Sequence, residues 1–177
     1  MAETVEQYVA RILSTLGGRE PMEVLRSTPS RLTELVSSLD ESTLRWRPQP
    51  GKWSIAEQLA HLADAEVVLG GRLRFAAAQP GSTIVAFDQD KWAATGKYAE
   101  IPAAASVATF STVRQWNLTF LDRLDAAARE GYAMHQERGR ETLAHMLKLI
   151  AGHDINHLNS MQQLAIAAAA RVSAKTA

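Results

Sequence analysis

The chain has 177 residues, enough for one domain with a sizeable core and too few for two comfortable ones. Its 19 basic and 19 acidic residues cancel, so no basic excess is available to neutralise phosphates and no nucleic-acid partner is expected. The absence of cysteine excludes disulfides, thiolate catalysis and cysteine-rich zinc sites, and it fits a cytoplasmic protein.

The N-terminal stretch carries no recognisable targeting signal. Residues 1–16 begin with acidic side chains and lack a continuous apolar core, so no signal peptide is predicted. No segment approaches the roughly 18 apolar residues of a membrane span, and the apolar run Leu164–Val172 is too short. We therefore expect a soluble protein without a membrane partner.

Apolar residues recur at helical spacing along almost every long segment, and no segment shows a convincing period of two. The first helix is predicted over residues 5–16 and ends at two glycines. A short helical turn is expected over 22–26. Thr28 followed by Pro29 is then typical of an N-cap and a first helical residue, and the apolar stripe of this next helix reaches Leu39.

The second half of the chain contributes three longer helices. After a loop over 45–53, Ser54 and Glu57 form a capping box, and a helix is predicted from there to about residue 78. A long connection follows, of the sort that often forms the wall of a site. Helices are then expected over 103–130 and 141–170, with a loop between them. The chain therefore predicts an all-α fold, a four-helix bundle with a long connection between the second and third long helices and short extra N-terminal helices.

The last helix carries His153 and His157 four residues apart, on the apolar face that also holds Met146 and Ile150. Two imidazoles at this spacing lie about 6 Å apart along one stripe, which suits two ligands of one metal ion. Two packed core histidines with hydrogen-bond partners are the alternative, and the pair alone does not decide between them.

Three further histidines are available as a third ligand. His145 lies two turns before His153 and on another side of the helix, and His135 lies in a predicted loop, so structural or surface roles are expected for both. His61 lies two turns after the capped start of its helix, about 120° from the main apolar stripe. The helical wheel places His61 on a flank, where it either lines a groove or is exposed.

Polar residues also fall inside two apolar stripes. Glu66 lies in the stripe of the second long helix, and Arg114 and Asn117 lie in that of the third. Because a buried charge is costly unless paired, we expect Glu66 to meet Arg114 with help from Asn117, as architecture rather than catalysis. The alternative is that they lie at an end of the bundle and reach water.

The ligand types favour a mononuclear site. A di-iron bundle needs two Glu-x-x-His units and two further glutamates, and this chain has one loose analogue over 154–157. Three histidines suit a single zinc, nickel, iron or cobalt ion with a position left open to water. Asp64 and Asp154 are candidates to accept hydrogen bonds from metal-bound imidazoles, with solvent-exposed charge as the alternative for both.

The combined pattern resembles the DinB superfamily of DinB-like or YfiT-like metal-binding four-helix bundles. The resemblance is carried by RPQPGKWSIAEQLAHLADAE, by FDQDKW in the long connection and by RGRETLAHMLKLIAGHDINHLNSMQQL. It covers about residues 28–164 of what we expect to be a single domain over 1–177.

This resemblance implies an up-down-down-up bundle, commonly a homodimer. It also implies one divalent metal ion held by His61, His153 and His157, most often zinc or nickel, with iron, cobalt or manganese as alternatives. Family members of known activity are metal-dependent enzymes that use a low-molecular-weight thiol, namely mycothiol-dependent maleylpyruvate isomerase and thiol S-transferases.

The activity implied is therefore a thiol S-transferase acting on a small electrophile, with a metal-bound thiolate or water as the reactive group. A metal-water hydrolase is one alternative. A non-catalytic metal-binding stress-response bundle is the other, and the alanine-rich segment 164–171 supports it as a surface for dimerisation or partner binding.

Overall fold

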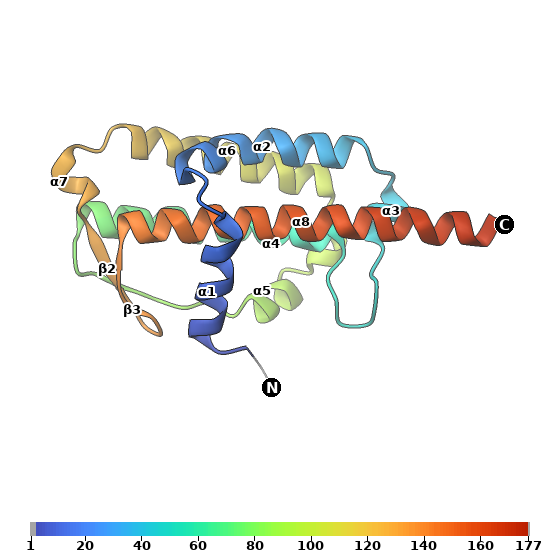
Figure 1. The fold of residues 1–177 in the computed structure, drawn as a ribbon, viewed down its shortest axis with the longest axis horizontal. Coiled ribbons are helices and arrows are strands. Elements are labelled where there is room, and N and C mark those ends of the chain that lie inside the picture. The colour runs from blue at the N-terminus through green and yellow to red at the C-terminus, as the bar shows by residue number, and fades with distance from the viewer. Residues whose placement is uncertain (1–2, 177) are drawn as a thin grey trace.

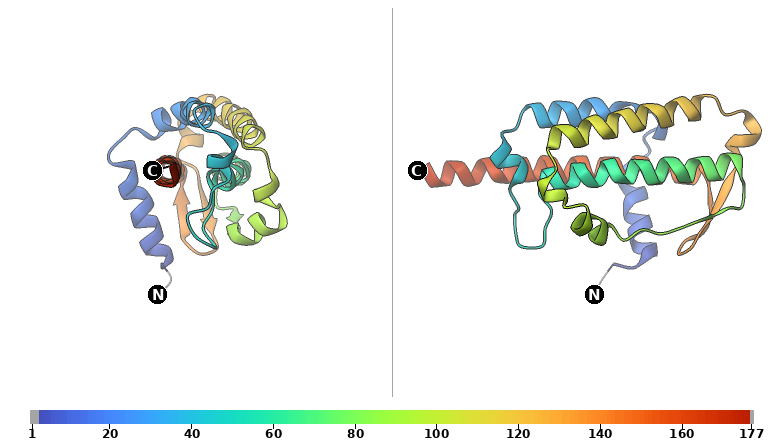
Figure 2. Two further views of the ribbon diagram at one scale, coloured as in Figure 1. Left: turned by 90° about the vertical axis from the view of Figure 1, so that its right-hand side faces the viewer. Right: turned by 180° about the vertical axis from the view of Figure 1, so that it is seen from behind.

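Four long helices form the body of the computed structural model, which describes residues 3–176 (Figure 1). They are α2 (Pro21–Ser37), α4 (Ile55–Ala78), α6 (Ala103–Asp122) and α8 (Leu143–Thr176). In Figures 1 and 2, α2 and α8 run in one direction while α4 and α6 run in the other, so the order is up-down-down-up. The all-α four-helix bundle predicted from the sequence is confirmed, with a small sheet as an addition.

Shorter elements surround the bundle. They are α1 (Val5–Leu16), α3 (Glu41–Arg45), α5 (Gln89–Thr95), the 3₁₀ helix η1 (Tyr98–Glu100) and α7 (Ala126–Arg129). Helix α1 crosses α8 steeply (Figure 1) and approaches it closely at Gly152, where an added Cβ would lie 2.2 Å from the Ile12 carbonyl oxygen. No helix within residues 3–176 combines the length and apolar character needed to cross a bilayer.

Helix α4 begins where the sequence predicted. The Ser54 hydroxyl accepts the Glu57 backbone N–H, and a Glu57 carboxylate oxygen accepts the Ser54 backbone N–H at 2.9 Å. This reciprocal cap satisfies N–H groups that a helix start otherwise leaves unpaired.

Helix α2 does not begin at Pro29, and that prediction is wrong. Pro29 lies inside a helix that starts at Pro21. Because proline has no N–H, it cannot donate to the Leu25 carbonyl four residues earlier. Arg114 Nη1 of α6 donates to that carbonyl instead, at 3.0 Å, so a tertiary contact replaces the missing helical bond.

The predicted helix over 103–130 and the predicted loop after it also need correction. Helix α6 ends at Asp122, and Asp125 caps the separate α7 by accepting the Ala128 N–H. The supposed loop forms the hairpin of β2 (Tyr132–His135) and β3 (Gly139–Thr142). Strand β1 (Thr83–Ile84), from the long connection, pairs with β2 in parallel. Strands of two to four residues are too short to show an alternating pattern.

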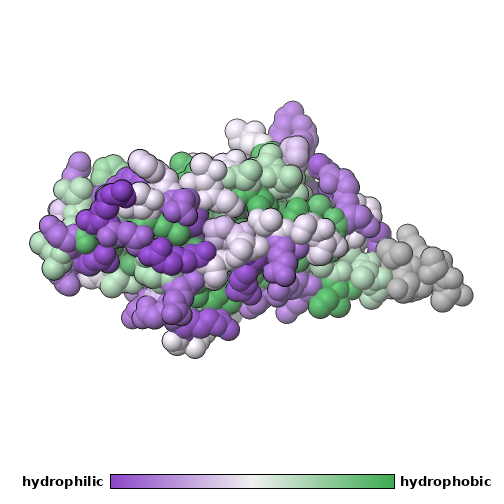
Figure 3. All heavy atoms as spheres, turned by 90° about the horizontal axis from the view of Figure 1, so that it is seen from above, coloured by the Kyte–Doolittle hydropathy of each residue, from purple (hydrophilic) through white to green (hydrophobic). Residues whose placement is uncertain are grey.

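The apolar core consists of two clusters with a buried polar layer between them. One contains Leu25, Leu73, Leu118 and Ile150, and the other contains Leu32, Leu59, Phe110 and Leu158. On α4 and α6, Glu66 and Arg114 fall between the residues of the two clusters. Outside the core, polar and apolar side chains interleave over the face seen in Figure 3.

Candidate metal centre

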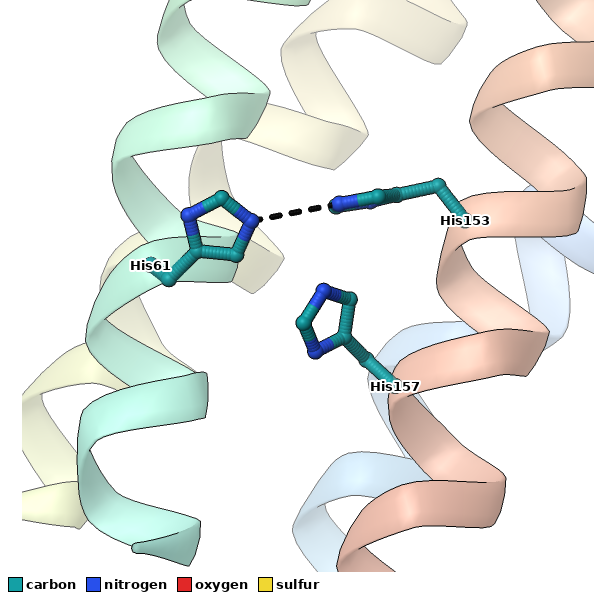
Figure 4. A group of neighbouring side chains, drawn as sticks. All are labelled: His61, His153 and His157. Atoms are coloured by element: carbon teal, nitrogen blue, oxygen red, sulfur yellow. Dashed lines mark hydrogen bonds between the residues drawn. The ribbon is translucent and has the colours of Figure 1, made fainter. Parts of the chain in front are cut away.

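Three histidines from two helices converge on one point. His61 projects from α4, and His153 and His157 project from α8, with their rings turned toward one another (Figure 4). One ring nitrogen from each histidine lies within 4.8 Å of the corresponding nitrogens of the other two, and the Nε2 atoms of His61 and His153 are 3.2 Å apart. Among the described residues, no carboxylate or fourth histidine joins this group.

The helical wheel was least informative for His61. Its side chain is 1% exposed, although the wheel placed it on a flank. The long connection and the loop before α4 cover that flank, because the His61 ring lies 5.1 Å from the Trp53 ring and 6.4 Å from the Phe87 ring between centroids. Helix α4 is therefore buried on more than its main apolar stripe.

All three imidazoles are neutral near pH 7. Burial lowers the pKa of His61 to about 4 and that of His157 to about 3, and burial together with the other two histidines lowers the pKa of His153 as well. Neutral imidazoles keep a lone pair free for a cation, so the cluster fits a metal ion better than it fits three protonated side chains.

Gln58 determines which nitrogen of His157 is available. The Gln58 Oε1 atom lies 3.0 Å from His157 Nδ1, and a carboxamide oxygen can only accept, so Nδ1 carries the proton. His157 Nε2 is then left unprotonated and free to bind a metal. Gln58 was not among the residues predicted from the sequence, although it precedes His61 by three residues and therefore shares its side of the helix.

The two aspartates proposed to support the imidazoles have other partners. The Tyr98 hydroxyl donates to Asp64, and His61 Nδ1 has no hydrogen-bond partner within residues 3–176. Asp154 accepts two hydrogen bonds from Arg114.

Arg114 organises the buried polar layer. It donates to both carboxylate oxygens of Glu66, at 2.9 and 2.7 Å, and to Asp154 at 2.7 Å. Asn117 donates to Glu66 at 2.7 Å. Burial acts to lower the pKa of Arg114, but the two carboxylates outweigh it and raise that pKa. The layer ties α4, α6 and α8 together one residue from His153, so it supports the histidines through the backbone.

Two cavities adjoin the histidines. The first has a volume of about 340 Å³ and extends from His61 and His153 to Arg72 and His135. The second has a volume of about 580 Å³, is lined by His153 and His157, and carries polar groups such as Lys52.

The two remaining histidines lie outside the triad. His135, expected at the surface of a loop, lies on β2 and is buried, which corrects that expectation. His145 lies half-buried near the start of α8.

The sequence of this chain is similar to those of known proteins. The profile of the DinB superfamily matches residues 25–161. A protein of Oceanobacillus iheyensis named "putative metal-dependent hydrolase" is 27% identical over 139 residues, covering 78% of this chain and 80% of the relative. A Bacillus cereus protein of the same name is 23% identical over 136 residues, covering 77% and 78%.

A solved structure also matches. It is YfiT from Bacillus subtilis, described as "a probable metal-dependent hydrolase with an unusual four-helix bundle topology". The TM-score is 0.76, the sequence identity is 19%, and the match covers 92% of this chain and 88% of that chain. At this identity the similarity shows a shared fold.

Proposed function

The chain belongs to the DinB superfamily, and on this premise we propose that it is a metal-dependent enzyme whose His61, His153 and His157 hold one divalent metal ion. The observation that carries the proposal is the convergence of three neutral imidazoles, which no fourth histidine or carboxylate of the described residues joins. Three protein ligands and an open position are typical of catalytic rather than structural metal sites.

Zinc or nickel is the metal we propose. The donors are three imidazole nitrogens without a carboxylate or thiolate, and imidazole suits zinc, nickel, copper and iron better than it suits magnesium or calcium. Iron, cobalt and manganese are the alternatives, and elemental analysis of the purified protein decides among them.

The reaction we propose is transfer of a low-molecular-weight thiol to a small electrophile. His153 lines both cavities, so a molecule in either cavity lies next to the triad, which suits a reaction of two substrates. The larger cavity, of about 580 Å³, carries Lys52, Gln58 and Asn156, which suit a hydrophilic thiol. The smaller cavity, of about 340 Å³, is largely apolar between its ends.

The proposed transfer exchanges one bond to carbon for another. When bound, the metal ion would act as a Lewis acid that lowers the pKa of the thiol. The sulfur–carbon bond forms as the bond from carbon to the leaving group breaks, and the thiol proton passes to solvent. Trp53 and Phe87, which cover His61, exclude water from that side.

Hydrolysis is the second candidate, because the named relatives are described as metal-dependent hydrolases. It would use the same triad with water in place of the thiol. The two candidates differ in whether turnover requires an added thiol.

The test is a panel of thiols assayed with a chloronitrobenzene electrophile, with and without added zinc or nickel. Conjugation that needs both metal and thiol would support the transferase. Product formed without a thiol would favour the hydrolase, and no turnover of any kind would favour a non-catalytic bundle. A homodimer stays a prediction, to be measured by sedimentation equilibrium.

A further inference from the structure

Arg72 of α4 is a buried cation that has no anionic partner among the described residues. Arg72 is 8% exposed, and its guanidinium forms no ion pair with any residue in the described part of the chain. It donates to the Val85 carbonyl, and its buried Nε atom has no hydrogen-bond partner among the residues that the structure describes. Arg114 shows how this fold pairs a buried guanidinium, because that residue has two carboxylates.

The charges around Arg72 do not compensate it. The buried carboxylate of Glu141, which interacts electrostatically with Arg72, is held by Arg138 through two hydrogen bonds of 2.6 and 3.1 Å. The other acidic neighbour, Glu137, is exposed to solvent. Burial and the proximity of Arg138 lower the pKa of Arg72. A buried unpaired charge is costly, so its retention points to an anion that arrives from outside the chain.

His135 supplies a second unpaired donor. Its Nδ1 accepts the Glu137 backbone N–H at 3.2 Å and therefore carries no proton in the neutral ring. Burial lowers the pKa of His135, which keeps the ring neutral. The proton then lies on Nε2, which is buried and has no acceptor among the described side chains and backbone.

Both residues line the 340 Å³ cavity, at the end opposite the triad. Along α4 the lining residues are His61, Ala65, Leu69 and Arg72, a spacing that follows one face of the helix over about 16 Å. The Phe87 ring lies between the two ends, with its centroid 5.7 Å from the Arg72 guanidinium carbon and 6.4 Å from the His61 ring. The cavity thus has the hydrogen-bond donors of Arg72 and His135 at one end, apolar side chains in the middle and the histidine triad at the other end.

We propose that Arg72 and His135 bind the carboxylate of the substrate, so that the electrophile is a small carboxylic acid with an apolar body whose far end reaches the triad. A guanidinium presents its N–H groups as a planar fork that matches a carboxylate, and the His135 Nε2–H adds a neutral donor. The identity of the reactive end rests on the proposed function, whereas binding of the carboxylate requires neither a metal nor turnover.

The test is isothermal titration calorimetry with 4-phenylbutyrate and its uncharged analogue 4-phenylbutanamide. Because a carboxylate can also bind a metal, both titrations are done on the metal-loaded protein and on the protein after chelation. We expect the acid to bind about tenfold more tightly than the amide, or better, in both states. Equal affinity for the two, or preference for the acid only in the metal-loaded state, would overturn the proposal.

Variants locate the binding site. Arg72→Gln is expected to abolish the preference for the acid, and His135→Gln to reduce it severalfold. Arg72→Lys keeps the charge without the fork, so it should give intermediate affinity, and it tests the proposal should the glutamine variant not fold. Arg123→Gln removes the same charge from an exposed position and should bind the acid like wild type. Acid binding retained in a folded Arg72→Gln protein would contradict the proposal, even if turnover by the metal centre is demonstrated.

Discussion

Replacing Arg114 by methionine should be among the most destabilising changes in this protein. The arginine is 1% exposed and donates five hydrogen bonds, two to Glu66, two to Asp154 and one to the Leu25 carbonyl. Methionine can fill much of the space but can donate to none of these oxygens. Two buried carboxylates would lose their cation, and the carbonyl opposite Pro29 would lose its donor.

The magnitude follows from these losses. Removing one partner of a buried ion pair costs about 3–5 kcal/mol, and leaving a buried carbonyl unpaired adds about 1–3 kcal/mol. We therefore expect the free energy of unfolding to fall by at least about 4 kcal/mol, a large part of the about 5–15 kcal/mol typical of a domain. Urea unfolding followed by circular dichroism measures this difference.

Two further variants serve as controls for Arg114→Met. Arg26→Met removes a half-exposed ion pair with Asp122 from α2 and should cost about 1 kcal/mol or less. The triple variant Glu66→Leu, Arg114→Met, Asp154→Leu leaves no charge of the layer behind, so it should lose less stability than Arg114→Met alone. A loss below about 1.5 kcal/mol in Arg114→Met would refute the view that this guanidinium neutralises buried charge.

The remaining predictions concern the triad. Alanine at His61, His153 or His157 should remove the metal found by elemental analysis, whereas His145→Ala should retain it. Metal retained in His61→Ala would contradict the ligand set. Gln58→Leu should weaken metal affinity by about 10–100-fold in a competition titration, because it frees the Nδ1–H of His157; unchanged affinity would exclude that role. The folded-state pKa values of His61 and His157, about 4 and 3, lie below the ordinary 6.5. The unfolded chain therefore binds more protons, and the metal-free protein should lose stability as pH falls from 6.5 toward 4, by up to about 1.4 kcal/mol per pH unit for each histidine. A flat stability profile over this range would show that these histidines are solvated.

Local patterns were sufficient to detect the long helices, though not the start of α2 or the end of α6, and they were sufficient for part of the site. The capping box at Ser54 and the recurrence of apolar residues located α4, and the same periodicity turned His153 and His157 inward. Periodicity failed for His61, because its flank is covered by Trp53 of the preceding loop and Phe87 of the long connection, and neither residue belongs to α4. For that residue the family resemblance was the better guide.

The sequence by itself determined the four helices, the polar residues buried within them and the pair of histidines on α8, since these follow from the repeat of the helix and the cost of burying charge. Only the tertiary structure decided that α2 continues through Pro29, because the donor that completes it is Arg114 of another helix. It also decided that His135 and Arg72 share one cavity, since the strands that carry the hairpin to that place are too short to leave a pattern. Contacts between segments far apart in the chain, rather than local helix propensity, therefore form the surroundings of the three histidines.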